Sequence, residues 1–231
     1  MWGMTSRPST SPRTEHRFTV GFDLDLTLVD SRPGIRASYE ALVAATGVPI
    51  DVDLVISRLG PPLLTELRNW FPEEKVQEAN ALYLAGYPSH GIEPSPAMPG
   101  ARESMAAVRE LGGRAIVVTA KYVRNARLHL EHLEMEPDEL IGDLWAENKA
   151  LALREHGASV YVGDHVGDVL GARKAGALAV AVPTGPYGVE ELRAAGADVV
   201  LPGGLTDFPA WLRSHVASYA AESAPAVRPS V

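Results

Sequence analysis

Two aspartates separated by one residue, Asp23 and Asp25, are the first side chains along the sequence whose type and spacing suggest chemistry. They follow the apolar run 18–22, which is typical of a short buried strand. Carboxylates this close repel each other, so the pair is costly unless a cation or a proton lies between them. At the end of a parallel strand, both would face the crevice where open α/β folds bind ligands. A solvated acidic turn remains the alternative for this pair taken alone.

A second acidic pair, Asp164 and Asp168, follows another apolar run at 159–163. The two aspartates bracket a turn that contains glycine, which permits a tight backbone near a ligand. Hard oxygen ligands of this kind suit Mg²⁺, which prefers a few carboxylates together with water and substrate phosphate. Capping of the next helix explains Asp168 but not both aspartates. His165, which lies between them, is expected to be a surface or loop residue rather than a ligand.

Thr119 and Lys149 add a hydroxyl and an ammonium group. Thr119 ends the β-branched run 115–118, where a hydroxyl and free N–H groups at a helix start can bind phosphate oxygens. A helix cap is the simpler interpretation of a single threonine, and a solvated surface residue is the simpler interpretation of Lys149. Four carboxylates, one hydroxyl and one ammonium group together fit metal-assisted phosphoryl transfer.

Alternating strands and helices must position these residues. From Pro99 onward, apolar runs alternate with helical patterns, which predicts right-handed crossovers and a parallel sheet. Between Asp30 and Pro96 only helical patterns occur, and this block closes with the Pro-rich stretch 87–96, expected to be a loop. Ser31 is expected to cap the first helix of the block, with Pro33 in its first turn. The block predicts a helical insertion directly after the first strand.

Composition excludes several classes of function. The formal net charge of −8 argues against a nucleic-acid or anionic-membrane partner, and the absence of cysteine excludes disulfides and thiolate metal sites. No apolar run approaches the roughly 20 residues that a membrane span needs. Residues 1–17 lack the apolar core of a signal peptide and are expected to be a disordered leader, and residues 218–231 a flexible tail. We therefore expect a cytoplasmic protein, as a monomer or homodimer.

The sequence resembles the haloacid dehalogenase superfamily, in its phosphatase branch, and is most similar to the phosphoglycolate-phosphatase-like subgroup. Residues 23–30 resemble the first motif of that family, Thr119 the second, Lys149 the third, and Gly163-Asp164 with Asp168 the fourth. The resemblance implies an α/β fold with a Rossmann-like parallel sheet and helices on both faces. It also implies a catalytic core formed by 18–30 and 97–217, with 31–96 as a small, inserted all-α cap.

The resemblance further implies a role for each motif residue. Asp23 would be the nucleophile that forms an aspartyl-phosphate, and Asp25 the acid and then the base. Thr119, Ala120 and Lys149 would bind the substrate phosphoryl group, and Lys149 would also offset the charge of Asp23. The Mg²⁺ ligands would be Asp23, the backbone carbonyl of Asp25, and Asp164, with Asp168 supporting the metal or Lys149.

Asp25 also distinguishes between branches of the family, because dehalogenases and phosphonatases lack a carboxylate at this position. Its presence favours a Mg²⁺-dependent phosphatase acting on a small phosphorylated metabolite. The alternatives are a phosphomutase of the β-phosphoglucomutase type and a catalytically silent binding module on the same fold.

Three positions depart from the family pattern. Leu26 replaces the usual glycine of the first motif, and Ala120 replaces a common asparagine, although Lys121 is retained. The cap segment 83–87 lacks the arginine often found between its tyrosines, which argues against phosphoglycolate as the substrate.

The cap loop 58–62 contains two of the expected substrate-binding residues, Arg58 and Gly60. This loop is expected to close over the site, with Arg58 or Arg68 meeting a second anionic group. Solvated arginines are an equally good interpretation.

Overall fold

The structure is a computed structural model that describes residues 17–222. The expected leader, apart from Arg17, lies outside the described residues, as does the end of the expected tail. Within the described part, no helix is both long and apolar enough to cross a membrane.

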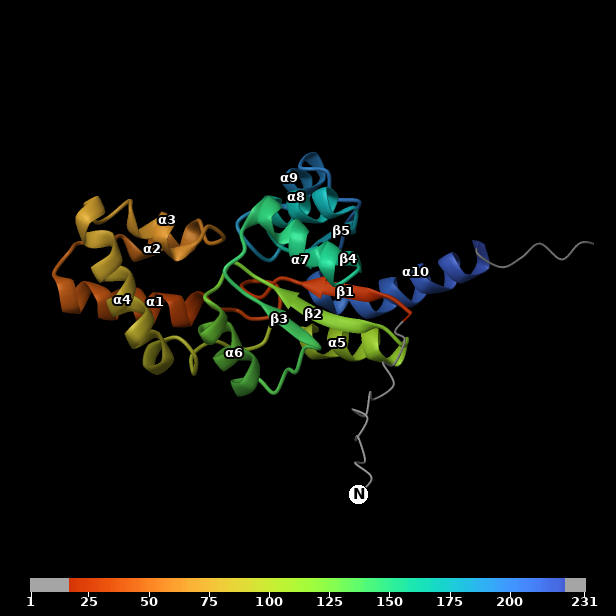
Figure 1. Ribbon diagram of the computed structural model, residues 1–231, viewed down its shortest axis with the longest axis horizontal. Coiled ribbons are helices and arrows are strands. Elements are labelled where there is room, and N and C mark those ends of the chain that lie inside the picture. The colour runs from red at the N-terminus through yellow and green to blue at the C-terminus, as the bar shows by residue number, and fades with distance from the viewer. Residues whose placement is uncertain (1–16, 223–231) are drawn as a thin grey trace, which may run out of the picture.

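A single sheet of six parallel strands forms the centre of the molecule, in the order β3-β2-β1-β4-β5-β6 (Figure 1). The strands are β1 Thr19–Phe22, β2 Arg114–Val118, β3 Glu139–Ile141, β4 Ala158–Gly163, β5 Leu178–Ala181 and β6 Val199–Val200. β1 lies between β2 and β4, with Val20 opposite both Ala115 and Val160. The strand order therefore reverses at β1, where open α/β sheets place a ligand crevice beyond the carboxyl ends.

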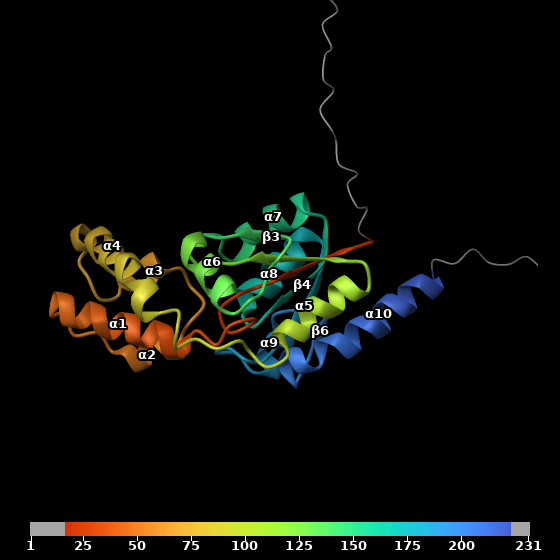
Figure 2. The ribbon, with the colours of Figure 1, turned by 90° about the horizontal axis from the view of Figure 1, so that it is seen from below.

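Helices cover both faces of this sheet, which confirms the predicted α/β fold (Figure 2). One face packs against α5 Ala101–Glu110, α6 Val123–His132 and α10 Phe208–Glu222, and the other against α7 Lys149–Glu155, α8 Val166–Ala175 and α9 Val189–Ala194. β1 alternates between the two layers: Phe22 packs in the first, and a Cβ on Gly21 would lie 2.8 Å from the Tyr161 ring in the second. The site residues are thus placed by a sheet that is buried on both sides.

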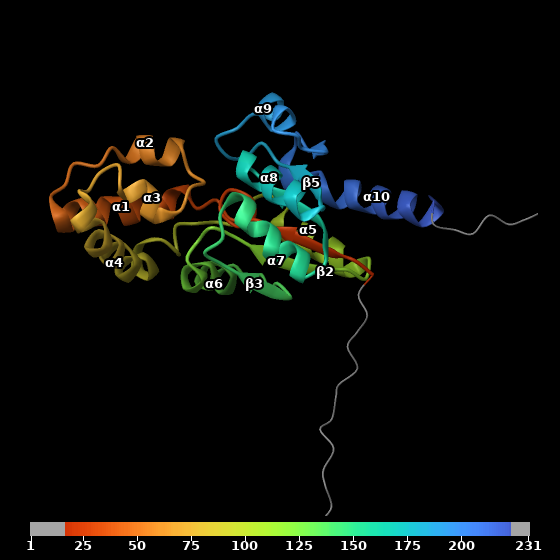
Figure 3. The ribbon, with the colours of Figure 1, turned by 45° about the horizontal axis from the view of Figure 1, so that its top comes forward.

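Four helices form a separate layer beyond one end of the sheet, between β1 and β2 in the sequence (Figure 3). They are α1 Arg32–Thr46, α2 Val52–Ser57, α3 Leu63–Leu67 and α4 Glu73–His90. Ile35, Tyr39 and Leu42 recur at helical spacing on α1, and they pack with residues of α4 in a hydrophobic cluster of their own. We refer to residues 31–96 as the cap.

The two chain segments that join the cap to the core run side by side. Asp30 N–H donates to the Pro96 carbonyl at 2.9 Å, and Met98 N–H donates to the Leu28 carbonyl at 2.9 Å. An antiparallel bridge between Val29 and Ala97 completes this short ribbon. The cap therefore enters and leaves the core at one place.

Three local expectations are corrected by the structure. The stretch predicted as a loop from Tyr87 is helical as far as His90, because the burial of Tyr87 outweighs the one backbone hydrogen bond that Pro88 removes in the last turn of α4. The last helix continues past Ser218 to Glu222, in keeping with the high helix propensity of its alanines. Ser31 does precede α1, but its side chain makes no capping hydrogen bond.

Candidate active site

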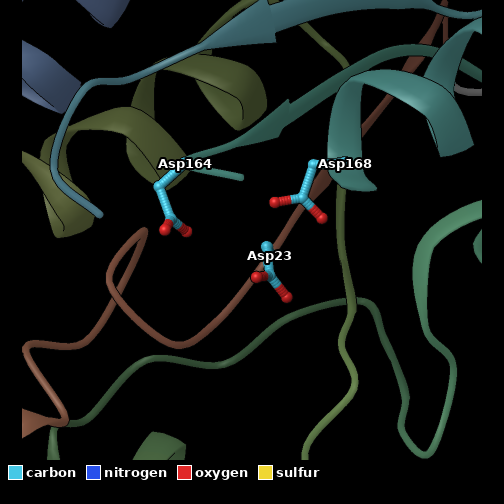
Figure 4. A group of neighbouring side chains, drawn as sticks. All are labelled: Asp23, Asp164 and Asp168. Carbon is cyan, nitrogen blue, oxygen red and sulfur yellow. The ribbon is translucent and has the colours of Figure 1, made fainter. Parts of the chain in front are cut away.

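Asp23, Asp164 and Asp168 converge at the carboxyl ends of β1 and β4 (Figure 4). One carboxylate oxygen of each lies within 4.8 Å of those of the other two. Asp23 N–H donates to the Val162 carbonyl at 2.8 Å, so the backbone after β1 is fixed to β4. Two neighbouring parallel strands thus bring residues about 140 positions apart into one carboxylate cluster.

Lys149 is completely buried beside this cluster, so its interpretation as a solvated surface lysine is wrong. Its Nζ donates to Asp23 Oδ1 at 2.9 Å, to Asp168 Oδ1 at 2.7 Å and to the Tyr161 hydroxyl at 2.9 Å. Burial alone would lower the pKa of Lys149, but the charges of Asp168 and Asp23 outweigh it and raise that pKa. Lys149 is therefore a fixed positive charge against the proposed nucleophile.

Asp168 uses both carboxylate oxygens inside the protein. Oδ1 accepts from Lys149, and Oδ2 accepts from the His165 N–H at 3.1 Å. A Cβ on Gly163 would overlap Asp168, so only glycine permits this approach. These contacts favour the second of its two expected roles, the support of Lys149.

His165 is buried, which corrects its assignment as an ordinary surface or loop residue. It is the N-cap of α8, and its Nδ1 accepts from the Gly167 N–H at 2.9 Å. Its ring makes edge contacts with Trp145 and Tyr187 at centroid distances of 4.8 and 4.7 Å. Burial lowers its pKa, which favours the neutral imidazole.

Two residues to which the sequence assigned no role, Thr27 and Gly185, accommodate the Asp164 side chain. Its Oδ1 accepts from the Thr27 hydroxyl at 2.9 Å. A Cβ on Gly185, in the loop after β5, would overlap Asp164 Oδ2, so a glycine there makes room for the carboxylate.

The carboxylate cluster fits a divalent cation. Burial, and then the charges of Asp168 and other carboxylates, raise the pKa of Asp23 to about 7 in spite of Lys149. The same two causes raise the pKa of Asp164 well above its ordinary value. A hard cation between such carboxylates would remove the repulsion, and oxygen ligands of this kind suit Mg²⁺.

Asp25 lies outside the carboxylate cluster and has its own cation. Lys121 Nζ donates to Asp25 Oδ1 at 2.9 Å, and it lies 4.6 Å from the centroid of the Tyr87 ring. Burial would raise the pKa of Asp25, but the charge and hydrogen bond of Lys121 outweigh it, and the pKa is lowered. Lys121 was recognised in the sequence only as a retained residue; its place two positions after Thr119 was the available signal.

Tyr87 connects the pair of Asp25 and Lys121 to core helix α6. Its hydroxyl lies 2.9 Å from Nε2 of His129 on α6, whereas Tyr87 itself belongs to cap helix α4. Burial, reinforced by the charge of Lys121, lowers the pKa of His129 to about 3, so this imidazole is neutral. A polar chain therefore runs from Asp25 through Lys121 and Tyr87 to His129.

The backbone around the motif residues accommodates two of the three departures from the family pattern, those at Leu26 and Ala120. Leu26 has φ +60°, the left-handed conformation that favours glycine, yet its side chain is buried. Leu26 N–H donates to the Val29 carbonyl at 2.7 Å, and its own carbonyl accepts from the Thr184 hydroxyl at 2.6 Å. These bonds hold the strained residue in place.

The Thr119 hydroxyl accepts from the Lys121 N–H at 3.2 Å, and Thr119 and Ala120 both line the cavity described next.

A cavity of about 100 Å³ lies between cap and core, and Asp23, Asp25 and Asp164 line its core side. Of the expected cap residues, Arg58 and Gly60 line it and Arg68 does not. Arg58 forms a two-pronged ion pair with Glu66, at 2.9 and 2.6 Å. Gly60 has φ +142° and packs on the His165 ring, where a Cβ would lie 2.5 Å from Cδ2.

Comparison with known proteins extends these observations. Residues 20–173 match the sequence model of a family described as haloacid dehalogenase-like hydrolase, and residues 146–203 match a related hydrolase model. Phosphoglycolate phosphatase of Chromobacterium violaceum is 29% identical over 209 residues, which cover 81% of this chain and 93% of that protein.

Two further comparisons cover different shares of the chain. Tyrosine-protein kinase PtkA of Mycobacterium tuberculosis is 34% identical over 132 residues, which cover 57% of this chain but only 44% of PtkA. The solved structure of a haloacid dehalogenase-like hydrolase from Streptococcus pneumoniae superposes with a TM-score of 0.73 at 24% identity, covering 86% of this chain and 98% of that one. At that identity the likeness shows the fold alone.

Proposed function

Because the chain belongs to the haloacid dehalogenase-like hydrolase family, we propose that it is a Mg²⁺-dependent phosphatase of a small phosphorylated metabolite. The observation that carries this proposal is Lys149, which contacts both Asp23 and Asp168 from a fully buried position. A buried ammonium group beside a buried carboxylate is costly to maintain, and phosphoryl transfer needs both.

The proposed reaction has two steps on the protein. A carboxylate oxygen of Asp23 attacks phosphorus and the bond from phosphorus to the alcohol oxygen breaks. Asp25 is ionised in the free protein, so it first takes a proton from solvent as the substrate binds and then gives that proton to the alcohol oxygen. Water then attacks the aspartyl-phosphate, Asp25 takes a proton from the water, and inorganic phosphate leaves Asp23 free.

The other residues hold charge and geometry during both steps. Lys149 and Thr119 bind phosphoryl oxygens, and Asp168 keeps Lys149 in position. Mg²⁺, held by Asp23, Asp164 and the backbone carbonyl of Asp25, would neutralise charge on the transferred group. A cytoplasmic location, a monomeric or homodimeric state, and the absence of nucleic-acid and membrane partners belong to the same proposal.

Substitution of the nucleophile tests the proposal. Asp23→Asn keeps the shape of the side chain but removes the attacking carboxylate, so the rate of para-nitrophenyl phosphate hydrolysis should fall by about a thousandfold or more. Asp53→Asn, at an exposed aspartate of the cap, is the matched control and should leave the rate unchanged. Mass spectrometry of acid-quenched enzyme should detect an added phosphoryl group in the wild type only. Undiminished turnover by Asp23→Asn would refute the mechanism.

A further inference from the structure

The cations that line the cavity between cap and core are already neutralised. Arg58 and Lys121 both line it, and each forms a short ion pair, with Glu66 and Asp25 respectively. Glu66 is fixed further by the Trp70 indole N–H, which donates to its Oε1 at 2.7 Å. Among the residues lining this cavity, no lysine or arginine is left without a carboxylate partner to meet a second anionic group on a substrate.

Apolar and aromatic groups supply most of the cap side of the cavity. Six of them are Ile35, Tyr39, Val55, Leu63, Tyr83 and Tyr87. The rings of Tyr39 and Tyr83 lie 5.0 Å apart, and those of Tyr83 and Tyr87 lie 5.5 Å apart, so three rings from α1 and α4 form a continuous aromatic wall. Such a wall gains free energy by covering apolar or aromatic surface, and it offers a carboxylate no positive charge.

We propose that the substrate is a phosphate monoester whose alcohol is uncharged and aromatic, bound with its ring against Tyr39 and Tyr83, and not a phosphorylated carboxylic acid. This inference rests on the proposed phosphatase function and specifies its substrate class. The phosphoryl group lies at Asp23, and the alcohol extends into the cap. A carboxylate in that place would meet the charges of Glu66 and Asp25 without a free lysine or arginine, so it would lose hydration without gaining an ion pair.

Three alkyl phosphates of similar leaving-group strength test this substrate class. Benzyl phosphate carries an uncharged ring, ethyl phosphate lacks it, and 2-phosphoglycolate carries a carboxylate. We expect kcat/KM to fall in that order, with benzyl phosphate at least about tenfold above 2-phosphoglycolate, because even single methylene groups in apolar pockets change kcat/KM by about ten- to 200-fold. Two phosphonates that cannot be hydrolysed test binding alone. Calorimetry with Mg²⁺ should show a lower Kd for 2-phenylethylphosphonate than for 3-phosphonopropionate.

A variant that releases Arg58 tests the charge argument. Glu66→Gln removes the partner of Arg58 but retains an oxygen for Trp70, so kcat/KM for 2-phosphoglycolate should rise about two- to fivefold relative to benzyl phosphate. The matched control is Glu73→Gln, which releases the exposed Arg68 outside the cavity and should leave the ratio unchanged. Circular dichroism checks that both variants fold.

The possible results separate the inference from the function beneath it. If the wild type hydrolyses 2-phosphoglycolate as well as or better than benzyl phosphate, the substrate class is wrong and the phosphatase remains. An equal rise for both esters in Glu66→Gln also contradicts the charge argument. If none of the esters nor para-nitrophenyl phosphate is hydrolysed, the proposed function fails, and the inference fails with it.

Discussion

At the scale of single residues, the buried carboxylates couple the site to protons. The pKa of Asp23 rises from its ordinary value of 3.8 to about 7, since burial and neighbouring negative charges disfavour ionisation. The folded protein therefore holds a proton that the unfolded chain has lost between those two pH values. The contribution of Asp23 to stability without metal should fall as pH rises through this window and then level off, because the full cost of ionised Asp23 is reached above about pH 7.

Mg²⁺ binds the ionised carboxylates, so its stabilising effect should depend on pH. The rise in melting temperature on adding Mg²⁺ should be larger at pH 8 than at pH 5.5, since fewer protons must be displaced from Asp23 and Asp164. Scanning calorimetry with Mg²⁺ and with chelator at each pH measures this difference and cancels other titrating groups. Asp164→Asn should lose most of the rise. Equal rises at both pH values would contradict this account.

Single residues also show what the sequence could and could not predict. Asp23 and Asp164 were predictable because each stands at the end of an apolar run, and parallel strands place such ends together. Tyr161 and Gly185 were not, because the first acts through a hydroxyl that reaches Lys149 and the second through the space it leaves for Asp164. Those contacts depend on three-dimensional approach and leave no pattern in the sequence.

At the scale of elements, the cap loop 58–62 meets the core in a close contact at Gly60. Gly60 lies against the ring of His165, and that ring is fixed by its capping of α8 and by two aromatic neighbours. The ring cannot move aside cheaply, so the loop position depends on the absence of a side chain at residue 60. The sequence predicted a loop over the site, but not its contact, because it predicted an exposed His165.

Gly60→Ala should displace this loop from the core. Its Cβ would lie 2.5 Å from His165 Cδ2, and φ +142° adds backbone strain. We expect kcat/KM to fall with a rise in KM, together with a loss of about 1–3 kcal/mol in the free energy of unfolding.

Gly47→Ala is the control that carries backbone strain alone, because Gly47 has φ +70° and a Cβ there would have no neighbour within 4 Å. It should lose about 1–2 kcal/mol of stability and keep its kcat/KM. An equal loss of kcat/KM in both variants would show that the contact between residue 60 and the His165 ring does not set the position of the loop.

At the scale of the whole molecule, the order of elements was predictable and their lengths were not. Alternating apolar runs and helical patterns predicted the parallel sheet, and the absence of strand patterns between Asp30 and Pro96 predicted the helical insertion. The end of α4 was missed because proline usually stops a helix, whereas Pro88 lies within the last turn of this one. Tertiary packing of Tyr87 decided that boundary, since this side chain is buried against the core.

The placement of β1 has a consequence for the order in which the chain folds. Its Val20 pairs with Ala115 and Val160, which leave the ribosome much later, whereas α1 and α4 find their partners within residues 32–90. Contacts distant in sequence form more slowly than local ones. In refolding followed by pulsed hydrogen exchange, amides of α1 and α4 should be protected before those of β1, and simultaneous protection would contradict this order. β1, the strand that leads into the nucleophile, is thus synthesised before its partners β2 and β4, and its pairing in the sheet is completed only after the cap helices have formed.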